Sequence, residues 1–585
     1  MLAVIPTEKL LLGYEELNKL EPFRIESRFK GRRSEKDTRH KDTSQKSVRD
    51  YWTVKGRRYL GQLTTYARHD TYGIFFTERA VSLIMKQPLV LSFVVVSAFF
   101  NNVDCRTFSP TDILDRVNEL HNKIEEMQIK TTTSFTPPIF WTKMKGVYES
   151  DVKQYFHGQP DMHFMREEFK IFDNNMFATA WVTTVLLETY KFAHGPKPSE
   201  QQIKMSLEAI SEHSNKNYNF SNSIMTFWRQ KFNASTGVWV CAPDNLLEFF
   251  KMTYDLPWPV IEEFLHALGL DAVEDIVKFL LSTRDGYLTA FQVPADFDDT
   301  FVNVGLGSLL REMAPDFPES NSFWTQRNRN LTFIFSELKR VAYRPLTSEE
   351  SVNTIDPRTY FYIRKFLQNT VSERKDLALI PTWVQNLDDI RKYAGKGNDI
   401  PGNINNVDVT VAANAIFGIT NGILTGLFNA TLLDDADIQK LYLNTSTLIS
   451  YEIMTNLSDR QDLALTYYPS EFEFYWFVAR TFTQLERRFK AGALPHPAME
   501  TVRLLFGGAL RGHAYEVIVN KSITDGNDKV YFDDFIGDGD KSWTNKTEIR
   551  GEDRIFTTSM AVNALTTIWT VFDDSTQTLI WDKCK

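Results

Sequence analysis

Four stretches of the chain share one pattern of polar and apolar positions. Each begins with an aspartate and one or two further polar residues, and continues as a weakly charged run rich in Ala, Gly, Ser and Thr. The stretches are 172–187, 297–310, 407–428 and 552–572, and their aspartates are Asp173, Asp298, Asp408 and Asp553. Because a helix that is apolar on all sides is buried, the pattern predicts four buried helices with polar starts.

Helices of a second kind lie between these stretches. Residues 198–214, 273–282 and 471–489 are charged along one face and apolar along the other. This arrangement is typical of helices at a protein surface. The alternation of the two kinds predicts an inner ring of helices wrapped by an outer ring.

The spacing of the buried stretches favours a closed ring. They recur after about 110 to 145 residues, so that each interval has room for two helical hairpins and three intervals for six hairpins. Six hairpins close an α/α toroid, and strand signals are few. We therefore expect an all-α fold, an (α/α)6 toroid of inner and outer helices over residues 151–585. An irregular helical bundle is the alternative.

The chain before this domain divides into three parts. Residues 1–84 are basic and polar, which predicts a disordered extension or a segment wrongly added to the gene, with translation starting at Met85. A basic tail that binds polyanions is a further alternative. Residues 85–104 combine Lys86 with an apolar run of about a dozen residues, which is typical of a secretory signal peptide and too short to span a bilayer. A buried core segment is the alternative. Residues 105–150 predict a helix over 109–128, capped by Ser109 or Thr111, and a linker.

Glycosylation sequons agree with a secreted protein. Eight N-x-S/T motifs occur where about five are expected by chance, and they begin at Asn219, Asn233, Asn330, Asn429, Asn444, Asn456, Asn520 and Asn545. We expect a glycoprotein that is secreted or resides in the lumen of the secretory pathway.

Composition narrows the classes of partner. A formal net charge of −9 and a pI near 5.7 argue against nucleic acid as the main partner. The sequence contains no apolar span of 18 residues, so no transmembrane helix is predicted. The three cysteines, Cys105, Cys241 and Cys584, are far apart and form neither a disulfide framework nor a metal motif.

The second buried stretch begins in "PADFDDTFVNVGLGSLL", which places Asp296, Asp298 and Asp299 within four positions. Helix capping accounts well for one of these aspartates, because a carboxylate accepts hydrogen bonds from the free amides of the first turn. Three carboxyl groups in a poorly hydrated interior cannot all ionise, so one of them would keep its proton. Such an acid could protonate an alkene or an epoxide.

"DFDDT" resembles the D-x-D-D-T motif of the class II terpene cyclases, the superfamily of squalene–hopene cyclase and the diterpene cyclases. The resemblance is sharp over 294–303. It implies an α/α toroid, an isomerase or lyase activity on a small apolar substrate, and a mechanism without metal or other cofactor. It also implies that Asp298 is the proton donor and that Asp296 and Asp299 hold its proton in place. "QKFNASTGVW" (230–239) loosely resembles the family's Q-x-x-x-G-x-W repeat.

Aromatic residues near the starts of the buried helices fit this chemistry, because ring faces stabilise cations. The candidates for substrate binding, which include two of the helix-start aspartates, are Phe172, Asp173, Phe177, Trp181, Phe297, Phe301 and Asp408. Packing in the core is the alternative for each aromatic residue.

Two other functions remain open. A secreted (α/α)6 carbohydrate-active hydrolase or lyase would need a pair of carboxylates, with Asp298 and either Asp173 or Asp408 as the pair. A non-catalytic secreted toroid could bind a ligand on the same scaffold.

Two polar clusters could bind metal ions. Asp533, Asp534, Asp538 and Asp540 follow one another in a Gly-rich acidic segment, which predicts either a solvated loop or a calcium site. His157 and His163 flank Asp161 in a second cluster.

Overall fold

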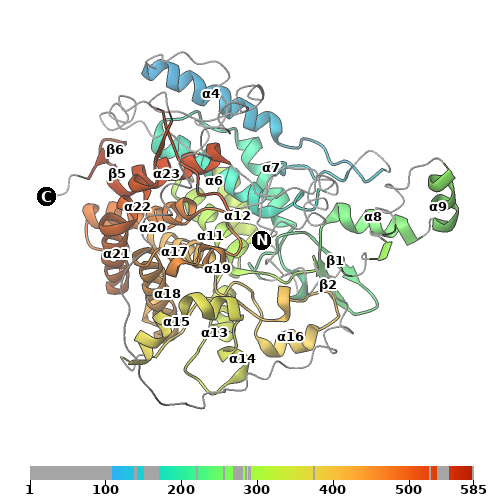
Figure 1. Cartoon of the computed structure of the whole chain (residues 1–585). Helices are drawn as coiled ribbons and strands as arrows, with labels where there is room; N and C mark the ends of the chain where they lie inside the picture. Colours follow the sequence, from blue (N-terminus) through green and yellow to red (C-terminus); the bar gives the residue numbers. More distant parts are fainter. Residues whose placement is uncertain are drawn as a thin grey trace, which may run out of the picture. The chain divides into compact units, whose positions relative to one another are not determined.

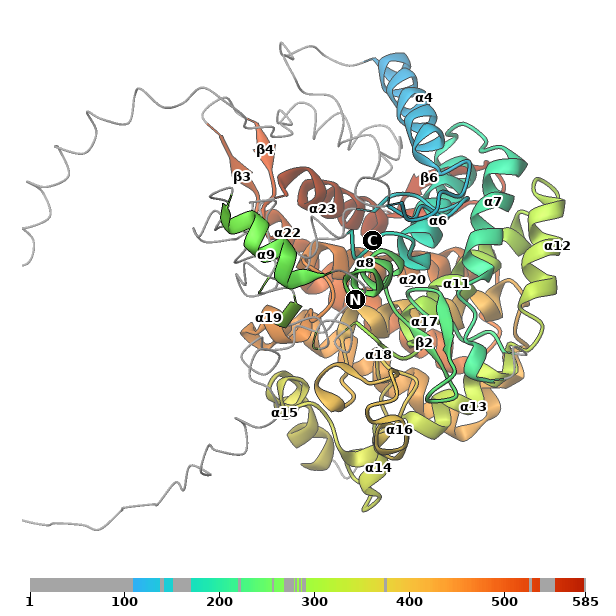
Figure 2. The same cartoon turned by 90° about the vertical axis from the view of Figure 1, so that its right-hand side faces the viewer.

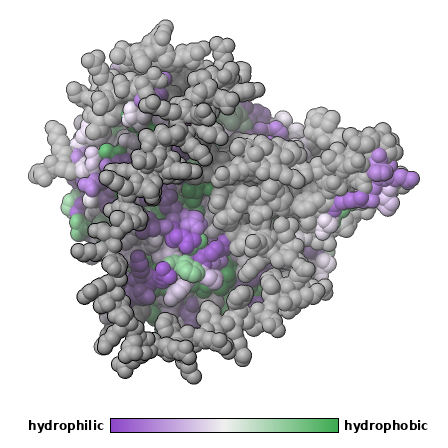
Figure 3. Space-filling model, viewed as in Figure 1, coloured by the Kyte–Doolittle hydropathy of each residue, from purple (hydrophilic) through white to green (hydrophobic). Residues whose placement is uncertain are grey.

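The computed structural model describes residues 109–136, 141–150, 170–218, 222–254, 257–267, 278, 281–282, 286, 291–372, 376–525, 529–536 and 553–582. This part of the chain is mostly helical, and its strands form three two-stranded antiparallel hairpins (Figures 1 and 2). The predicted all-α class is confirmed at this level. On the face in Figure 3, hydrophilic residues dominate the coloured surface and apolar residues show through in small areas.

Five buried helices form the centre of the described chain. They are α6 (Met176–Ala193), α11 (Phe297–Glu312), α17 (Val409–Leu424), α20 (Glu471–Ala491) and α23 (Arg554–Trp569). Four of them correspond to the four predicted stretches. In α11 every residue from Phe297 to Leu310 is buried, as expected for a helix with no polar face.

Small residues bring α11 and α17 close together. A Cβ atom at Gly418 of α17 would lie 2.8 Å from Cδ1 of Phe301, and one at Gly305 of α11 would lie 3.1 Å from Cε1 of Phe417. At Gly418 the added atom would also lie 2.9 Å from the backbone oxygen of Phe301, so only glycine fits there, whereas at Gly305 the Phe417 ring would have to shift slightly. The two helices lie side by side in both views (Figures 1 and 2).

The prediction of a surface helix over 471–489 was wrong for most of its length. The residues of α20 from Glu471 to Phe482 are buried, and the helix packs against α17, α21 and α23. Its charged residues misled the sequence interpretation, because Glu471, Glu473 and Arg480 are themselves buried. Only the last turns, which hold Arg488 and Lys490, reach the surface.

The buried helices follow one another in space in chain order. Helix α6 packs against α11, α11 against α17, α17 against α20, and α20 against α23. Outer helices cover them: α7 on α6, α12 on α11, α18 on α17, and α21 on α20. These outer helices are α7 (Glu200–Ser211), α12 (Pro318–Arg327), α18 (Ala436–Met454) and α21 (Pro497–Ala509). Helix α7 confirms the prediction for 198–214.

The helix predicted over 109–128 is α4 (Pro110–Met127), and Ser109 caps it as predicted. The remaining helices are α8 (Asp244–Tyr254), α9 (Trp258–Ala267), α13 (Thr332–Val341), α14 (Glu350–Asn353), α15 (Pro357–Ser372), α16 (Leu387–Tyr393), α19 (Gln461–Ala464) and α22 (Tyr515–Asn520). Short 3-10 segments and a π-helical turn at Leu510–Ala514 join some of them. No helix among the described residues is long and apolar enough to cross a bilayer.

The three hairpins are β1 (Gln230–Asn233) with β2 (Val238–Cys241), β3 (Ile523–Thr524) with β4 (Val530–Tyr531), and β5 (Thr570–Asp573) with β6 (Thr578–Trp581). The segment 230–239, compared above with a cyclase repeat, is thus the first hairpin. Its turn matches that of the third: Asn233 accepts a hydrogen bond from the Ser235 amide at 3.0 Å, and Asp573 accepts one from the Ser575 amide at 2.9 Å.

Several predictions lie outside the described residues. They include the extension 1–84, the signal-like segment 85–104, the sequons at Asn219 and Asn545, the cluster around His157 and His163, and the aspartates 538 and 540. Most of the predicted helix over 273–282 also lies outside them.

Candidate functional site

The aspartate triplet is buried at the start of α11. Asp296 is the N-cap, and its Oδ1 accepts a hydrogen bond from the Asp299 amide at 2.8 Å. The exposed fractions of Asp296, Asp298 and Asp299 are 1%, 0% and 0%. Capping therefore accounts for Asp296 alone, and the other two carboxyl groups need separate explanations.

Asp298 is held by two hydrogen-bond donors from other elements. Its Oδ1 accepts from Nδ2 of Asn414 on α17 at 2.8 Å, and its Oδ2 accepts from the Tyr468 hydroxyl at 2.5 Å. Asn414 also donates to the Tyr468 hydroxyl at 3.0 Å, which closes a triangle of side chains. Three segments far apart in the sequence thus meet at Asp298.

Burial raises the pKa of each carboxyl group in the triplet. Burial and then the charge of Asp296 raise the pKa of Asp298 to about 7, although Tyr468 and Asn414 oppose the shift. The same two causes raise the pKa of Asp299 well above its usual value, and burial raises that of Asp296 to about 6. Among the described residues no Lys, Arg or His forms an ion pair with the triplet. Neither oxygen of Asp299 has a hydrogen-bond partner there, so burial favours the protonated form of this carboxyl group.

A further buried carboxyl group extends this acidic cluster. Glu473 lies in the first turn of α20, and its Oε2 has no hydrogen-bond partner among the residues that the structure describes. Burial, followed by the charges of Asp534 and Asp298, raises the pKa of Glu473 well above its usual value. Asp534, one of the predicted calcium ligands, instead accepts hydrogen bonds from the Ser470 hydroxyl at 2.8 Å and the Phe472 amide at 3.0 Å.

Of the predicted helix-start aspartates Asp408 and Asp173, the first begins a helix as predicted and the second does not. Asp408 caps α17: its Oδ1 accepts from the Thr410 and Val411 amides at 2.8 and 3.2 Å, and its Oδ2 from the Tyr467 amide at 3.1 Å. Asp173 does not begin a helix, because α6 starts at Met176 and Asn175 is its cap. The asparagine amide supplies the same acceptor oxygen two residues later.

The predicted aromatic residues separate into two groups. Phe177 lies 5.9 Å from Tyr468, and Trp181 stacks on Phe477 at 4.9 Å, where these distances join ring centroids. Phe477 in turn contacts Tyr468 at 5.3 Å. This aromatic column, defined here as Phe177, Trp181, Tyr468 and Phe477, adjoins Asp298.

The other predicted aromatics pack elsewhere in the core. Phe172 contacts Phe227 and Trp228, while Phe297 and Phe301 contact each other across 6.1 Å and are fully buried. The sequence interpretation missed Asn414, Tyr468 and Phe477. The dipeptide Tyr467–Tyr468, just before a helix start, was the only local signal for one of them.

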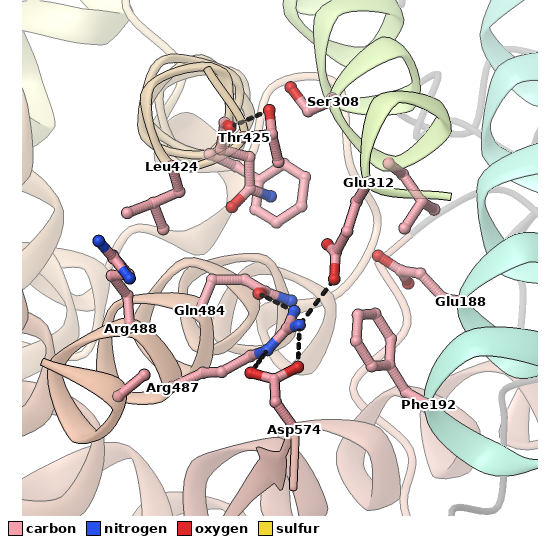
Figure 4. A pocket seen from close by; sticks show the side chains of 15 residues that line it. Glu188, Phe192, Ser308, Glu312, Leu424, Thr425, Gln484, Arg487, Arg488 and Asp574 are labelled. Carbon is pink, nitrogen blue, oxygen red and sulfur yellow. Dashed lines mark hydrogen bonds and ion pairs between the residues drawn. The ribbon is translucent and has the colours of Figure 1, made fainter. Parts of the chain in front are cut away.

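A cavity of about 310 Å³ lies at the opposite ends of these helices (Figure 4). Its lining residues come from the C-terminal halves of α6, α11, α17 and α20 and from the turn between β5 and β6. They are Glu188, Phe192, Gly305, Ser308, Leu309, Glu312, Phe417, Asn421, Leu424, Thr425, Gln484, Arg487, Arg488, Ala491 and Asp574. A neighbouring space of about 110 Å³ shares several of these residues and adds Asn563 and Thr567 of α23.

Ion pairs fix the centre of this cavity. Arg487 donates from Nε to Oδ2 of Asp574 at 2.9 Å and from Nη2 to Oε1 of Glu312 at 2.7 Å (Figure 4). Although burial opposes the charged form, hydrogen bonds from Arg487 to these two carboxylates raise its pKa above the usual value. Asp574 belongs to the β5–β6 turn, so the ion pair also holds that hairpin in place.

Arg480 separates the cavity from the aromatic column. It forms an ion pair with Glu188 at 2.5 Å, and its guanidinium carbon lies 4.0 Å from the Phe417 ring centroid and 4.7 Å from that of Trp181. Asp298 itself lines neither the larger cavity nor its neighbour. Ten helical residues separate it from Ser308, a rise of about 15 Å along α11.

Within the described residues, no group of three His, Cys, Asp or Glu side chains could hold a metal ion. In comparisons with known proteins, the chain matches no family, no curated protein and no solved structure.

Proposed function

We propose that the chain is an isomerase or lyase of the terpene-cyclase type, in which Asp298 protonates a small apolar substrate. One observation carries this proposal: the three carboxyl groups of the "DFDDT" motif are buried together at the start of α11, and no Lys, Arg or His among the described residues forms an ion pair with them. Burial raises the pKa of Asp298 to about 7, so that the protonated acid is available near neutral pH.

The surroundings of Asp298 suit a proton donor. The acid gives its proton to an alkene carbon or an epoxide oxygen and becomes a carboxylate. Asn414 and Tyr468 each donate a hydrogen bond to one of its oxygens, and such bonds stabilise the charged form. The carbocation formed in the substrate would meet the ring faces of the aromatic column, which attract positive charge.

The substrate must displace side chains to reach the acid. Both oxygens of Asp298 are engaged in hydrogen bonds, and Phe177 and Phe477 pack against Tyr468 beside it. The proposal therefore requires Phe177 and Trp181, which are only half-buried, to move aside when substrate binds. No metal or other cofactor takes part in this step.

The helix packing supports a toroid as the scaffold. Five buried helices follow one another in chain order, and all five contribute their C-terminal halves to the two adjoining cavities. They therefore run in the same direction, and an outer helix returns the chain after each of the first four. Parallel inner helices with antiparallel outer partners are what an α/α toroid requires.

The secretory location is a further part of this proposal. Sequons at Asn330, Asn429, Asn456 and Asn520 are exposed in the structure, where a glycan could be attached. N-terminal sequencing of secreted protein tests the predicted signal peptide. A mature end upstream of Met85 would contradict it.

The decisive test of the activity is Asp298→Asn, assayed with squalene and other polyprenyl substrates. The substitution keeps the shape of the side chain and removes the acidic proton, so turnover should fall by at least about 100-fold. Asp376→Asn, at an exposed ion pair with Lys440, is the control and should leave turnover unchanged. Equal turnover in the wild type and Asp298→Asn would remove Asp298 as the acid.

A second candidate is a carbohydrate-active enzyme, and the charged cavity favours it. Glu188 and Glu312 line an open space together with Phe192 and Phe417. The expected pair of Asp298 with Asp408 has less support, because Asp408 uses both its oxygens to cap α17 and to bind the Tyr467 amide. Hydrolysis of oligosaccharides that is lost in Glu312→Gln and kept in Asp298→Asn would favour this candidate.

A further inference from the structure

We propose that the cavity at the C-terminal ends of the inner helices binds a small organic carboxylate that also carries hydroxyl groups. The site is separate from Asp298, about 15 Å away along α11. The proposal does not depend on the activity suggested for Asp298.

One of the arginines near the cavity has no ion-pair partner among the described residues. Arg480 is paired with Glu188, while Arg487 is held by Asp574 and Glu312. Arg488 is exposed and lines the cavity, and among the described residues it has neither an ion pair nor a side-chain hydrogen bond. A guanidinium binds a carboxylate through two parallel hydrogen bonds, which makes Arg488 the anion-binding group.

The balance of charge also favours an anion. Glu188 balances Arg480. Glu312 and Asp574 together balance Arg487 and Lys191, which lies 3.8 Å from Glu312. The positive charge of Arg488 remains unbalanced, so a negatively charged ligand would neutralise the cavity.

Hydrogen-bond acceptors face the rest of the ligand. The ion pairs of Glu188 and Glu312 with arginine use only Oε1 of each carboxylate. The second oxygen of each, and the side-chain amide of Asn421, have no hydrogen-bond partner among the described residues. Hydroxyl groups suit these positions better than an ammonium group, because the two carboxylates are already neutralised.

The anion-binding arginine and the free carboxylate oxygens lie on different sides of the cavity, so they would contact different ends of the ligand. Figure 4 shows Arg488 beside Leu424 on one side of the cavity and Glu188 near Phe192 on the other, with Glu312 between them. The volume of about 310 Å³ is at the lower end of the range for small-molecule sites and suits a single sugar ring. Phe192 and Phe417 offer apolar surface to the carbon skeleton of such a ring.

The test compares D-glucuronate with D-glucose by isothermal titration calorimetry on the full chain. The two probes differ mainly in the carboxylate, so glucuronate should bind and glucose should bind at least about tenfold more weakly. Arg488→Gln should weaken glucuronate binding by about 10- to 100-fold, because it removes hydrogen bonds to a charged group. Arg488→Lys keeps the positive charge and should weaken binding less than Arg488→Gln does.

Arg329→Gln is the matched control, because Arg329 is also exposed and has no partner among the described residues. It should leave binding unchanged, and so should Asp298→Asn, which separates this site from the proposed acid. Absence of glucuronate binding, equal binding of glucose, or an Arg488→Gln variant that binds like the wild type would each overturn the proposal.

Discussion

Ionisation of Asp298 should make the fold less stable as the pH rises. In the unfolded chain an aspartate titrates near its ordinary pKa of about 3.9, whereas burial raises the pKa of Asp298 in the fold to about 7. Between these values the folded protein holds a proton that the unfolded chain has released. The free energy of unfolding therefore falls as the pH increases from about 4 to 7, and this contribution stays lost above pH 7.

The size of the effect follows from the shift in pKa. A shift of about three units corresponds to roughly 4 kcal/mol for this fully buried group. Asp298→Asn resembles the protonated acid and cannot ionise. It should therefore stabilise the protein by about 1–2 kcal/mol at pH 5, about one pH unit above the pKa of the unfolded chain, and by about 4 kcal/mol at pH 8.

Urea unfolding of the wild type and Asp298→Asn at pH 5 and pH 8 measures this difference. Asp376→Asn is the control, because its hydrogen bond with Lys440 lowers the pKa of that exposed carboxyl group, and its removal should give no gain at pH 8. If Asp298→Asn altered the stability equally at both pH values, Asp298 would not hold a proton that the unfolded chain releases, and the argument for an acid in a dry interior would fail.

Three further substitutions test the packing around the two sites. Gly307→Ala should destabilise the fold by about 1–3 kcal/mol, since the new Cβ would lie 2.1 Å from Cζ2 of Trp324; a melting temperature equal to that of the wild type would show that the helices separate easily. Arg480→Gln should lower the free energy of unfolding by about 3–5 kcal/mol, because it leaves Glu188 without its buried partner. Calorimetric unfolding measures this loss, and a smaller value would mean that water reaches the Glu188 carboxylate. Asp296→Ala should cost about 0.5–2 kcal/mol through loss of the N-cap of α11; a gain in thermal stability instead would mean that repulsion within the triplet outweighs the cap.

The sequence allowed the buried helices to be predicted because their composition is a local property. Helices α11 and α17 have no charged face, and they begin within two residues of the predicted starts. Helix α20 was misassigned because the charges of Glu471, Glu473 and Arg480 suggested a surface. Their burial depends on partners far away in the sequence, such as Glu188, which is 292 residues from Arg480.

The candidate site could be predicted only where it is local. The triplet Asp296, Asp298 and Asp299 is visible as a motif, and the structure buries all three. Asn414 and Tyr468 lie 116 and 170 residues from Asp298, so no local pattern connects them with it. The charged cavity was missed for the same reason, because its lining comes from the ends of several helices.

The common direction of the five buried helices explains how both sites tolerate their charges. Each helix carries roughly half a positive charge at its N-terminus and half a negative charge at its C-terminus. Carboxyl groups occupy the first turns of α11 and α20 and the N-cap of α17, while arginines occupy the last turns of α11 and α20. The dipoles thus favour the charged form of Asp298, which has no cationic partner within the described part of the chain. Without the helix dipoles the pKa of Asp298 would be higher still, and the carboxylate formed on proton transfer would be less stable. The same dipoles oppose an anion at the far cavity, so a ligand there depends on Arg488.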